Sequence, residues 1–270
     1  MHVPFSKYSG CGNDFILVDN RHLSFPFTQP KLIPQLCHRR TGVGADGVIL
    51  LENSTEADFR MRIFNADGSE AEMCGNGVRC LMKFIHELGI HKPHCTIETK
   101  EDQVHLSLKG ELVAVAMPLP YDLRWNHTVS IDDKDWELQY LNTGVPHAIL
   151  FVEALESEHW MSLAPKIRYH PSFNPKGTNV NFARVEAPGS VQIRTYERGV
   201  EGETLACGTG AVASAIAASR CYALKPPITI RPRSNDALQI DFEWQADCVK
   251  NVTMTGPATQ IFRGELVLNN

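Results

Sequence analysis

Short apolar runs bounded by turn residues fill the first part of the chain and predict β-strands. Runs rich in Val, Ile, Leu and Phe between Gly, Asn, Asp or Pro are typical of strands. They occur at residues 15–18, 48–51, 60–64, 95–99, 104–108 and 112–117. Residues 78–85, which follow a glycine-rich turn, instead predict a helix. This part of the chain therefore predicts a strand-rich unit with one central helix.

The second part of the chain repeats this succession. Strand-like runs lie at residues 138–141, 148–152, 180–185 and 191–196, before an alanine-rich helical run to Ala218, and at 228–230, 238–242 and 252–254 after it. A strand-rich half with a central helix, present twice, predicts an α+β fold with two pseudo-symmetric domains. We expect each domain to be a curved mixed sheet around its helix, with the active site in the cleft between them.

Two prolines mark the point where the parts separate. Pro118 and Pro120 are followed by the polar residues 121–129. Such segments are typical of domain boundaries. We therefore predict a boundary between residues 118 and 119.

Composition and charge narrow the class of protein. The 270 residues are 43% hydrophobic and 21% charged, with a formal net charge of −5. This describes a soluble globular protein without the basic footprint of a nucleic-acid-binding surface. No apolar run approaches membrane-spanning length, and residues 1–10 lack the features of a signal peptide. We expect a cytoplasmic protein with no nucleic-acid or membrane partner.

The eight cysteines are not spaced as a disulfide or metal framework. A cytoplasmic chain of this length does not need disulfides, and no Cys-x-x-Cys pair suggests a zinc site or a thioredoxin-type motif. Cys11 precedes a strand rather than a helix and is expected to be structural. The cysteines expected to be buried and inert are Cys37, Cys80, Cys95, Cys221 and Cys248.

A Gly-x-Gly-x-x-Gly match at residues 42–47 resembles a dinucleotide-binding fingerprint only superficially. That fingerprint follows a strand and opens a helix. Here residues 34–40 are predicted to be helical, Gly42 is a candidate C-cap, and a strand follows. We interpret the segment as a connecting turn.

The most informative pattern is a pair of related turns at residues 73–77 (Met-Cys-Gly-Asn-Gly) and 206–210 (Ala-Cys-Gly-Thr-Gly). Each follows a strand and an acidic turn, and each opens a helix. The positive end of a helix dipole makes the thiolate of Cys74 or Cys207 accessible near neutral pH. The Gly-x-Gly backbone lets N–H groups approach an anion.

Two such thiols suit inversion of configuration at a carbon atom. One thiolate removes a proton from one face while a thiol returns a proton to the other. Helix N-termini directed at the α-carboxylate of an amino acid would stabilise the carbanion-like transition state. No lysine lies in a recognisable pyridoxal phosphate context, so a cofactor-free route fits.

Several polar residues have two interpretations. His147 and Glu197 either tune the thiols or are surface and capping residues. Asn13 and Asp14 either form a turn or face the substrate. The residues alone do not distinguish these interpretations.

Five motifs together resemble the diaminopimelate epimerase family over nearly the whole chain. They are Gly12-Asn13-Asp14-Phe15, Phe64-Asn65-Ala66-Asp67-Gly68-Ser69, Cys74-Gly75-Asn76-Gly77-Val78-Arg79-Cys80, Tyr196-Glu197-Arg198-Gly199 and Ala206-Cys207-Gly208-Thr209-Gly210. The resemblance implies a homodimeric, cofactor-independent isomerase that interconverts LL- and meso-2,6-diaminopimelate for lysine and peptidoglycan precursor synthesis. It also implies that residues 257–270 return to the first domain. The predicted domains are thus 1–118 plus 257–270, with Cys74, and 119–256, with Cys207.

The resemblance also assigns roles to particular residues. Cys74 and Cys207 match the proton-transferring cysteines, and His147 and Glu197 match residues that modulate their pKa values. The positions that match substrate-binding residues are Asn13, Asn65, Gly75, Asn76, Asn179, Glu197, Arg198, Gly208 and Thr209.

The chain departs from the family pattern at three places. Gly47 replaces a glutamine found in some members, Val145 replaces the usual asparagine of a Gly-x-Pro-His turn, and the loop at residues 200–203 is one residue longer. Since valine cannot make the hydrogen bonds of asparagine, a broader amino acid racemase, acting for example on glutamate, is an alternative. A thiol redox pair and a non-catalytic binding protein are alternatives from other classes.

Overall fold

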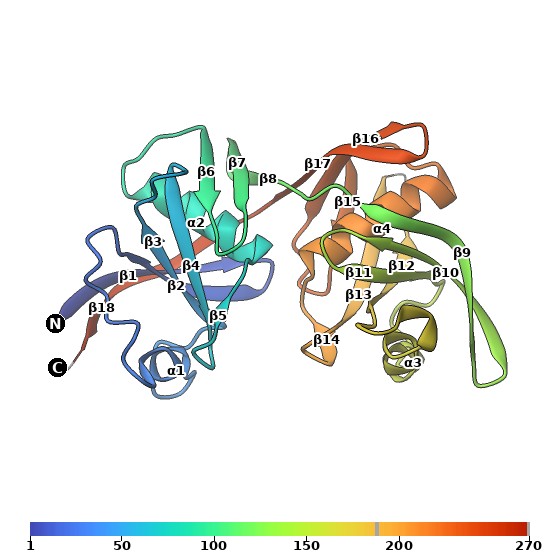
Figure 1. The fold of residues 1–270 in the computed structure, drawn as a ribbon, viewed down its shortest axis with the longest axis horizontal. Coiled ribbons are helices and arrows are strands. Elements are labelled where there is room, and N and C mark those ends of the chain that lie inside the picture. The colour runs from blue at the N-terminus through green and yellow to red at the C-terminus, as the bar shows by residue number, and fades with distance from the viewer. Residues whose placement is uncertain (187–188, 269–270) are drawn as a thin grey trace. The chain divides into compact units, whose positions relative to one another are not determined.

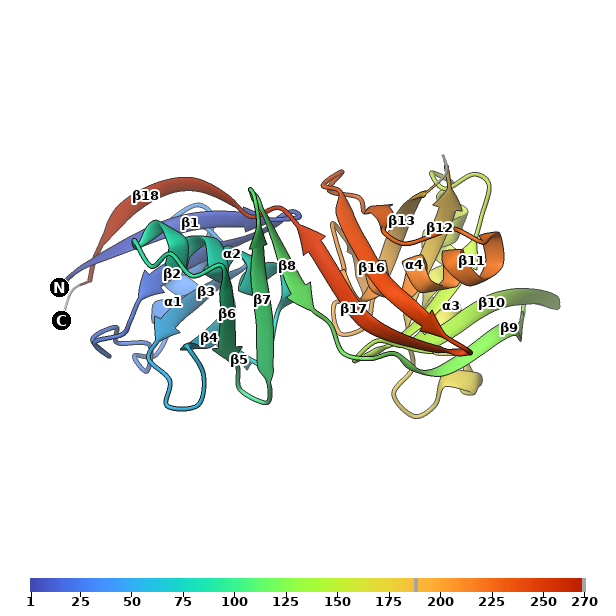
Figure 2. The same ribbon diagram turned by 90° about the horizontal axis from the view of Figure 1, so that it is seen from above.

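The computed structural model describes residues 1–186 and 189–268 and contains two compact units. Unit 1 is Met1–Val115 with Gly256–Asn270, and unit 2 is Ala116–Thr255. Both units are drawn in Figures 1 and 2. Residues 269–270, which the sequence assigns to the first domain, lie outside the described residues.

Unit 1 is a mixed sheet with two helices. Its strands are β1 (His2–Gly10), β2 (Asn13–Asp19), β3 (Gly47–Glu52), β4 (Phe59–Asn65), β5 (Glu70–Ala71), β6 (His94–Glu98), β7 (Gln103–Lys109), β8 (Leu112–Ala116) and β18 (Thr259–Val267). Its helices are α1 (Leu32–Cys37) and α2 (Gly75–Glu87). Unit 1 therefore takes its last strand from beyond unit 2 in the sequence, and β18 lies antiparallel beside β1 (Figures 1 and 2).

Unit 2 has the same succession of elements. Its strands are β9 (Tyr121–Ile131), β10 (Lys134–Asn142), β11 (Pro146–Phe151), β12 (Asn179–Val185), β13 (Ser190–Glu197), β14 (Gly202–Thr204), β15 (Ile228–Arg231), β16 (Leu238–Gln245) and β17 (Cys248–Gly256). Its helices are α3 (His159–Arg168), the short 3₁₀ helix η1 (Pro171–Phe173) and α4 (Gly208–Tyr222).

Strand pairing shows that the two units are copies of one plan. In unit 1, β2 is parallel to β3, β3 is antiparallel to β4, and β4 is parallel to β6. In unit 2, β11, β12, β13 and β15 pair in the same sequence of directions. The predicted α+β class and its internal duplication are therefore confirmed.

Each central sheet is buried on both faces, which explains its continuous apolar runs. In unit 1, Ile16 and Val48 pack with Leu36 of α1 in one core cluster, while Ile49 lies under the first turn of α2. In unit 2, α3 packs against strand residues such as Phe182 in a second cluster. The sheet thus holds α2 or α4, the helices that begin after the cysteines, in a fixed position.

The strands predicted from apolar runs are all present, but two local predictions are wrong. The polar residues 121–129, interpreted from sequence as part of a domain boundary, belong to strand β9, which pairs with β10. Gly42 is not a C-cap, because α1 already ends at Cys37 and its C-cap is His38. A Cβ at Gly42 would lie 2.0 Å from the carbonyl oxygen of Gln35, so this glycine permits a close return of the chain onto α1. The residues 42–46 connect α1 to β3, as expected for a turn.

None of the helices among the described residues has the length and apolar character that a membrane span requires.

Candidate active site

Cys74 and Cys207 are the N-cap residues of α2 and α4. Both have extended backbones, with φ of −141° and −128°. The first helical hydrogen bonds are donated by Val78 N to the Cys74 carbonyl and by Ala211 N to the Cys207 carbonyl, both at 2.9 Å. The N–H groups of the residues in between have no acceptor within their helix. Each cysteine therefore stands at a helix N-terminus that can bind an anion.

Short hairpins deliver the chain to each cysteine. The acidic turns predicted from sequence contain β5 and β14, which pair with β4 and β13. Asn65 is the last residue of β4 and is exposed, and its amide donates to Ser69 Oγ at 3.0 Å. Glu197 is the last residue of β13, and burial raises the pKa of its carboxyl. The strand ends thus place Asn65 and Glu197 just before the two cysteine turns.

Arg79 holds the first turn of α2 in unit 1. Its guanidinium is fully buried and donates to Asn76 Oδ1 at 2.8 Å, to the Gly75 carbonyl at 3.2 Å and to Cys11 Sγ at 3.1 Å. Asn76 Nδ2 then donates to Asn13 Oδ1 at 2.6 Å. Asn13 therefore lies beside the cysteine turn, and Cys11 has a structural contact with Arg79.

His147 occupies the corresponding region of unit 2. Its imidazole is fully buried, with Nε2 3.0 Å from Thr209 Oγ1 and Nδ1 3.0 Å from Asn181 Nδ2. Thr209 Oγ1 lies in turn 3.5 Å from Cys207 Sγ. Burial, together with the positive charge of Arg198, lowers the pKa of His147 to about 3. The imidazole is therefore neutral at physiological pH and connects to Cys207 through a hydroxyl group.

Asn179 fixes the backbone at Arg198. The Asn179 amide donates to the Pro146 carbonyl at 2.9 Å and accepts from Arg198 N at 2.8 Å. Across residues 1–186 and 189–268, no carboxylate forms an ion pair with the Arg198 guanidinium. This leaves the half-buried Arg198 fork able to bind a carboxylate from outside the chain.

Register assigns equivalent residues to the two units. Phe15 lies opposite Gly47 in the first parallel pair, as His147 lies opposite Asn179 in the second. On the next strand, Ile49 pairs with Ile63, as Asn181 pairs with Thr195. The positions beneath α2 are thus Phe15, Ile49 and Ile63, whereas those beneath α4 are His147, Asn181 and Thr195.

The sequence analysis missed Asn181 and Thr195. Both are buried, and Thr195 Oγ1 donates to Asn181 Oδ1 at 2.9 Å. The available signal was the presence of polar residues inside strands whose two faces are both buried. Such residues carry a desolvation cost and need a reason to be there.

The three positions that depart from the family pattern are Gly47, Val145 and the loop at residues 200–203, and each has a different environment. A Cβ at Gly47 would lie 2.4 Å from the carbonyl oxygen of Phe64, so any side chain there requires the backbone to shift. Val145 lies half-buried in the turn before β11, and its carbonyl accepts from Thr143 N at 3.1 Å. In the longer loop, Glu201 accepts from Arg168 at 2.9 Å.

The remaining cysteines divide into two groups. Cys37 and Cys95 are buried, which raises the pKa of each thiol, to about 11 and about 12, and burial also raises the pKa of Cys80. The predicted burial of these three is confirmed. Cys221 and Cys248 are exposed, so their predicted burial is wrong. Cys221 lies at the end of α4 and Cys248 at the start of β17, where side chains reach the surface.

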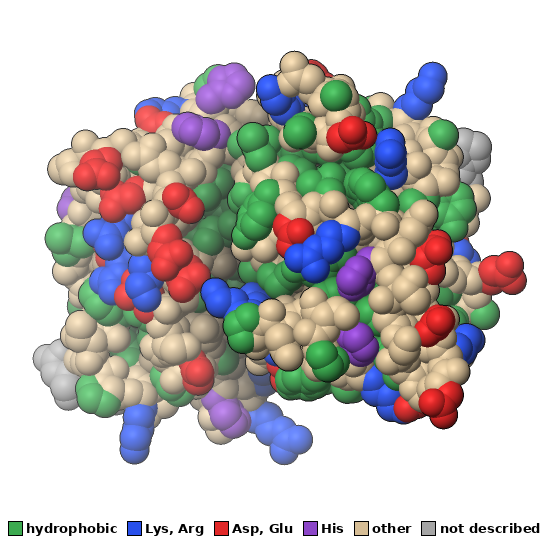
Figure 3. Space-filling model, turned by 45° about the vertical axis from the view of Figure 1, so that its right-hand side comes forward, with side chains coloured by type: hydrophobic (Ala, Val, Ile, Leu, Met, Phe, Trp, Pro, Cys, Tyr) green, Lys and Arg blue, Asp and Glu red, His purple; other side chains and the backbone are tan. Residues whose placement is uncertain are grey.

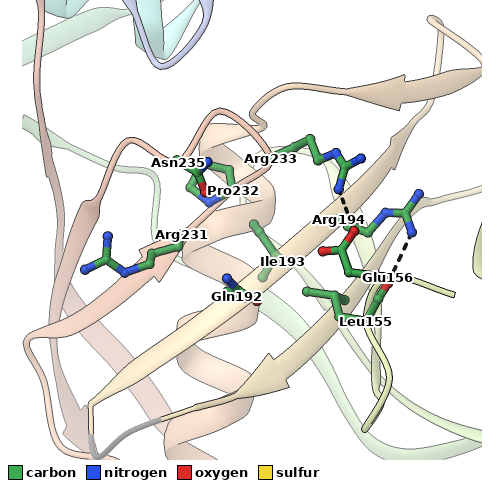
Figure 4. A pocket seen from close by; sticks show the side chains of 9 residues that line it. All are labelled: Leu155, Glu156, Gln192, Ile193, Arg194, Arg231, Pro232, Arg233 and Asn235. Carbon is green, nitrogen blue, oxygen red and sulfur yellow. Dashed lines mark hydrogen bonds and ion pairs between the residues drawn. The ribbon is translucent and has the colours of Figure 1, made fainter.

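A pocket elsewhere in unit 2 contains none of the predicted site residues (Figure 4). Arg233 pairs with Glu156 at 2.7 Å, and Arg194 donates to the Leu155 carbonyl (Figure 4). Arg194 also forms an ion pair with Glu203 at 2.7 Å. These arginine donors are used within the protein, so the pocket is a weak candidate for ligand binding. On the face drawn in Figure 3, acidic and basic side chains are interspersed, without an extended basic patch.

In the described part of the chain, no three His, Cys, Asp or Glu side chains are grouped so that they could hold a metal ion.

Comparison with known families gives a match along most of the chain. The family model described as "Diaminopimelate epimerase" matches residues 5–118 and 139–261. Proteins with that name are similar throughout: one from Aquifex aeolicus is 39% identical over 276 residues, covering 98% of each chain. One from Chlorobaculum tepidum is 40% identical, covering 96% of this chain and 100% of its own.

Solved structures with low sequence identity share the fold. A phenazine biosynthesis protein of the PhzF family from Bacillus anthracis superposes with a TM-score of 0.75 at 15% identity, covering 99% of this chain and 100% of that one. A hydroxyproline epimerase from Agrobacterium vitis has a TM-score of 0.67 at 16% identity, covering 100% and 93%. At these identities the likeness concerns the architecture alone.

Proposed function

This chain belongs to the diaminopimelate epimerase family, and from that premise we propose that it interconverts LL- and meso-2,6-diaminopimelate. The observation that carries the proposal is the pair of cysteine N-caps, each followed by Gly-x-Gly at the start of a buried helix. Lysine and peptidoglycan precursor synthesis are the processes that this reaction would serve.

The proposed mechanism exchanges one proton for another at the α-carbon. A thiolate removes the α-proton, so that a C–H bond breaks and an S–H bond forms. The second thiol then gives its proton to the opposite face, which inverts the configuration and leaves the thiol and thiolate exchanged. Cys74 and Cys207 take these two parts, and neither step requires a cofactor.

The backbone groups beside the cysteines stabilise the transition state in this proposal. Negative charge grows on the α-carboxylate as the proton leaves. The N–H groups at the two helix N-termini would donate hydrogen bonds to the carboxylate and so stabilise that charge. These are the N–H groups of Gly75 and Asn76 and of Gly208 and Thr209. Their geometry is fixed before the reaction, because both helices lie on buried sheets.

The other predicted residues would bind the substrate or modulate the pKa values of the two thiols. Arg198 supplies a planar fork for the distal carboxylate of the substrate, and Asn179 holds its backbone. Asn13 and Asn65 would contact the substrate from unit 1. Glu197 and His147 would modulate the thiols and, for Glu197, bind an ammonium group. Burial raises the pKa of Glu197 and lowers the pKa of His147, so both side chains lie where a charge is poorly solvated.

The direct test is α-proton exchange. Reduced protein is incubated with LL-diaminopimelate in D₂O without any cofactor, and loss of the α-proton NMR signal is followed. We expect exchange by the wild type and none by the Cys74→Ala, Cys207→Ala double variant. No exchange by folded, reduced wild type would overturn the assignment.

A broader racemase is the second candidate, and Val145 is the observation that favours it. The same assay on a panel that includes glutamate separates the two functions. Exchange restricted to diaminopimelate excludes the broader activity. The thiol redox alternative is weakened by the burial of Cys207, which is only 7% exposed, because exchange with another protein needs an accessible sulfur.

We also propose that the protein acts as a cytoplasmic homodimer. Ile261, Phe262 and Val267 of β18 are exposed apolar side chains, which supports an interface on this strand. Sedimentation velocity tests the proposal: Ile261→Asp should shift the protein towards the monomer mass. A wild type that sediments as a monomer at all concentrations would exclude it.

A further inference from the structure

A continuous chain of hydrogen bonds, buried as far as His147 and partly buried at Thr209, leads to Cys207 from the interior of unit 2. Thr195 Oγ1 lies 2.9 Å from Asn181 Oδ1, and Asn181 Nδ2 lies 3.0 Å from His147 Nδ1. His147 Nε2 lies 3.0 Å from Thr209 Oγ1, which is 3.5 Å from Cys207 Sγ. The members of this chain come from β11, β12, β13 and α4.

The surroundings of Asn181 determine which way its amide is oriented. Its Nδ2 atom lies 3.4 Å from the Ala148 carbonyl oxygen as well as near the imidazole. A carbonyl oxygen only accepts, so the atom that faces it must be the amide nitrogen. The oxygen then faces Thr195 Oγ1, which can donate. With this orientation, Asn181 is a hydrogen-bond donor to His147 Nδ1.

The amide orientation also decides where the imidazole carries its proton. A neutral imidazole has one donor nitrogen and one acceptor nitrogen. Since Nδ1 accepts from Asn181, the proton is on Nε2, which donates to Thr209 Oγ1. The Thr209 hydroxyl group, which accepts from the imidazole, then has its own proton available for Cys207 Sγ, 3.5 Å away.

We propose that Asn181 is a positioning residue for proton transfer: it fixes His147 as the Nε2–H tautomer, so that Thr209 donates a hydrogen bond to the sulfur of Cys207. A donor directed at the sulfur stabilises the thiolate over the thiol. The inference rests on the proposed function only in assigning proton transfer to Cys207. The fixed tautomer itself follows from the contacts alone.

The fold does not require this polar chain. The equivalent positions in unit 1 are Phe15, Ile49 and Ile63, and the same strand–hairpin–helix plan forms over them. A buried polar network costs desolvation energy unless every member is paired. Its presence beneath α4, where unit 1 has apolar side chains, therefore points to a role in the chemistry of Cys207.

The tautomer can be measured without any substrate. Protein labelled with ¹⁵N in histidine is studied by two-dimensional NMR, and His147 is assigned by its absence from His147→Gln. We expect the shifts of a neutral ring with an unprotonated Nδ1 and a protonated Nε2. A protonated Nδ1 in the wild type would overturn the proposal. In Thr195→Val the tautomer should be unchanged, because Asn181 Nδ2 keeps both acceptors.

The link to the thiol is tested by alkylation. In a Cys74→Ser background, the rate at which iodoacetamide modifies Cys207 at fixed pH is followed by mass spectrometry, which separates it from the exposed Cys221 and Cys248. Asn181→Asp offers only acceptors when ionised and should reverse the tautomer. We expect Cys207 to react about fivefold more slowly, as for the loss of one hydrogen bond of about 1 kcal/mol.

A double-variant cycle separates this route from a general effect of the new carboxylate. Thr209→Val removes the hydroxyl group and should slow alkylation to a similar extent, whereas Thr209→Ser should restore it. In the Asn181→Asp, Thr209→Val double variant we expect no further slowing, because both changes break the same link. Additive slowing would overturn the proposal. Neither measurement uses diaminopimelate. A failure of this proposal can therefore be told apart from a failure of the epimerase assignment.

Discussion

At the scale of single residues, different side chains surround the two cysteine turns. Cys207 is reached through a hydroxyl and a neutral imidazole, whereas the first turn after Cys74 is held by the fully buried guanidinium of Arg79. The imidazole near Cys207 is neutral, whereas the guanidinium near Cys74 carries a permanent positive charge. The two cysteine turns are therefore copies of one turn with different side-chain chemistry around them.

Burial of neutral His147 makes stability depend on pH. The pKa of His147 is about 3 in the folded protein, against a usual value of about 6.5. Between these values the unfolded state binds the extra proton, so the His147 contribution is complete above pH 6.5 and is lost as pH falls towards 3. We expect the free energy of unfolding to decrease by up to about 1.4 kcal/mol per pH unit more in wild type than in His147→Gln. Urea unfolding from pH 7 to pH 4 measures this, and equal slopes would contradict it.

Val145 is the residue at which substrate affinity is expected to be improvable. Restoring the asparagine usual in the family would add one hydrogen bond to the distal end of the substrate. Val145→Asn should lower KM for diaminopimelate by about two- to tenfold, as for 0.5–1.5 kcal/mol, with little change in kcat. Val145→Thr, which keeps the side-chain volume, is a matched control. An unchanged KM would show that this turn does not contact the substrate.

Candidate site residues that belong to a local motif could be predicted from the sequence, whereas residues whose contacts are made across neighbouring strands could not. Cys74 and Cys207 are recognisable because Cys-Gly-x-Gly follows a strand and a turn twice. Asn181 and Thr195 are ordinary polar letters in apolar strands, and their meaning depends on the register that pairs them. The local sequence around each residue does not predict that register.

At the scale of elements, glycine sets how closely each helix approaches its sheet. A Cβ at Gly77 would lie 2.9 Å from Ile49 Cδ1, and one at Gly210 would lie 2.5 Å from Asn181 Oδ1. The second helix therefore rests against a polar atom that is already hydrogen-bonded to Thr195 and cannot retreat freely. Close approach is what brings Thr209 within reach of His147.

Gly210→Ala should damage both stability and activity. Alanine favours a helix by about 1 kcal/mol over glycine, but overpacking at a fixed polar atom costs about 1–3 kcal/mol. The difference is a net loss of up to about 2 kcal/mol in the free energy of unfolding, and we also expect slower α-proton exchange. Gly202→Ala is the control, since its Cβ meets nothing within 4 Å. Equal unfolding energies for the two variants would contradict this account of α4.

Strands with a clear apolar run were predictable, including β7 and β16, which each have one exposed face, whereas elements of mixed composition were not. β9 has alternating exposed positions along residues 121–129, so its sequence resembled a polar domain boundary, although β9 pairs with β10. β1, β18 and α3 were likewise not predicted, because much of each faces solvent or carries mixed side chains. Backbone pairing, which the sequence does not display, decides these cases.

At the scale of the whole molecule, unit 1 depends on a distant strand. β18 pairs with β1 along most of its length, and the Pro257 carbonyl accepts from Arg79 at 3.3 Å. The residues that hold the Cys74 turn are therefore partly supplied from beyond unit 2.

Removing β18 should loosen unit 1 selectively. In a chain that ends at Gly256, β1 loses one partner strand and Arg79 loses one acceptor. We expect faster amide hydrogen exchange in β1, β2 and the first turn of α2, with β12 and β13 still protected. Loss of α-proton exchange should accompany this change. Unchanged protection in β1 would show that β18 is dispensable for the sheet.

The pairing of β1 with β18 has a consequence for synthesis on the ribosome. Every residue of unit 2 is made before the first residue of β18, so unit 2 can fold while the sheet of unit 1 is still incomplete. One edge of β1 then presents unpaired N–H and C=O groups for the whole time needed to make residues 116–258. The nascent chain carries an open strand edge during that interval, and the half that is begun first is the half that is finished last.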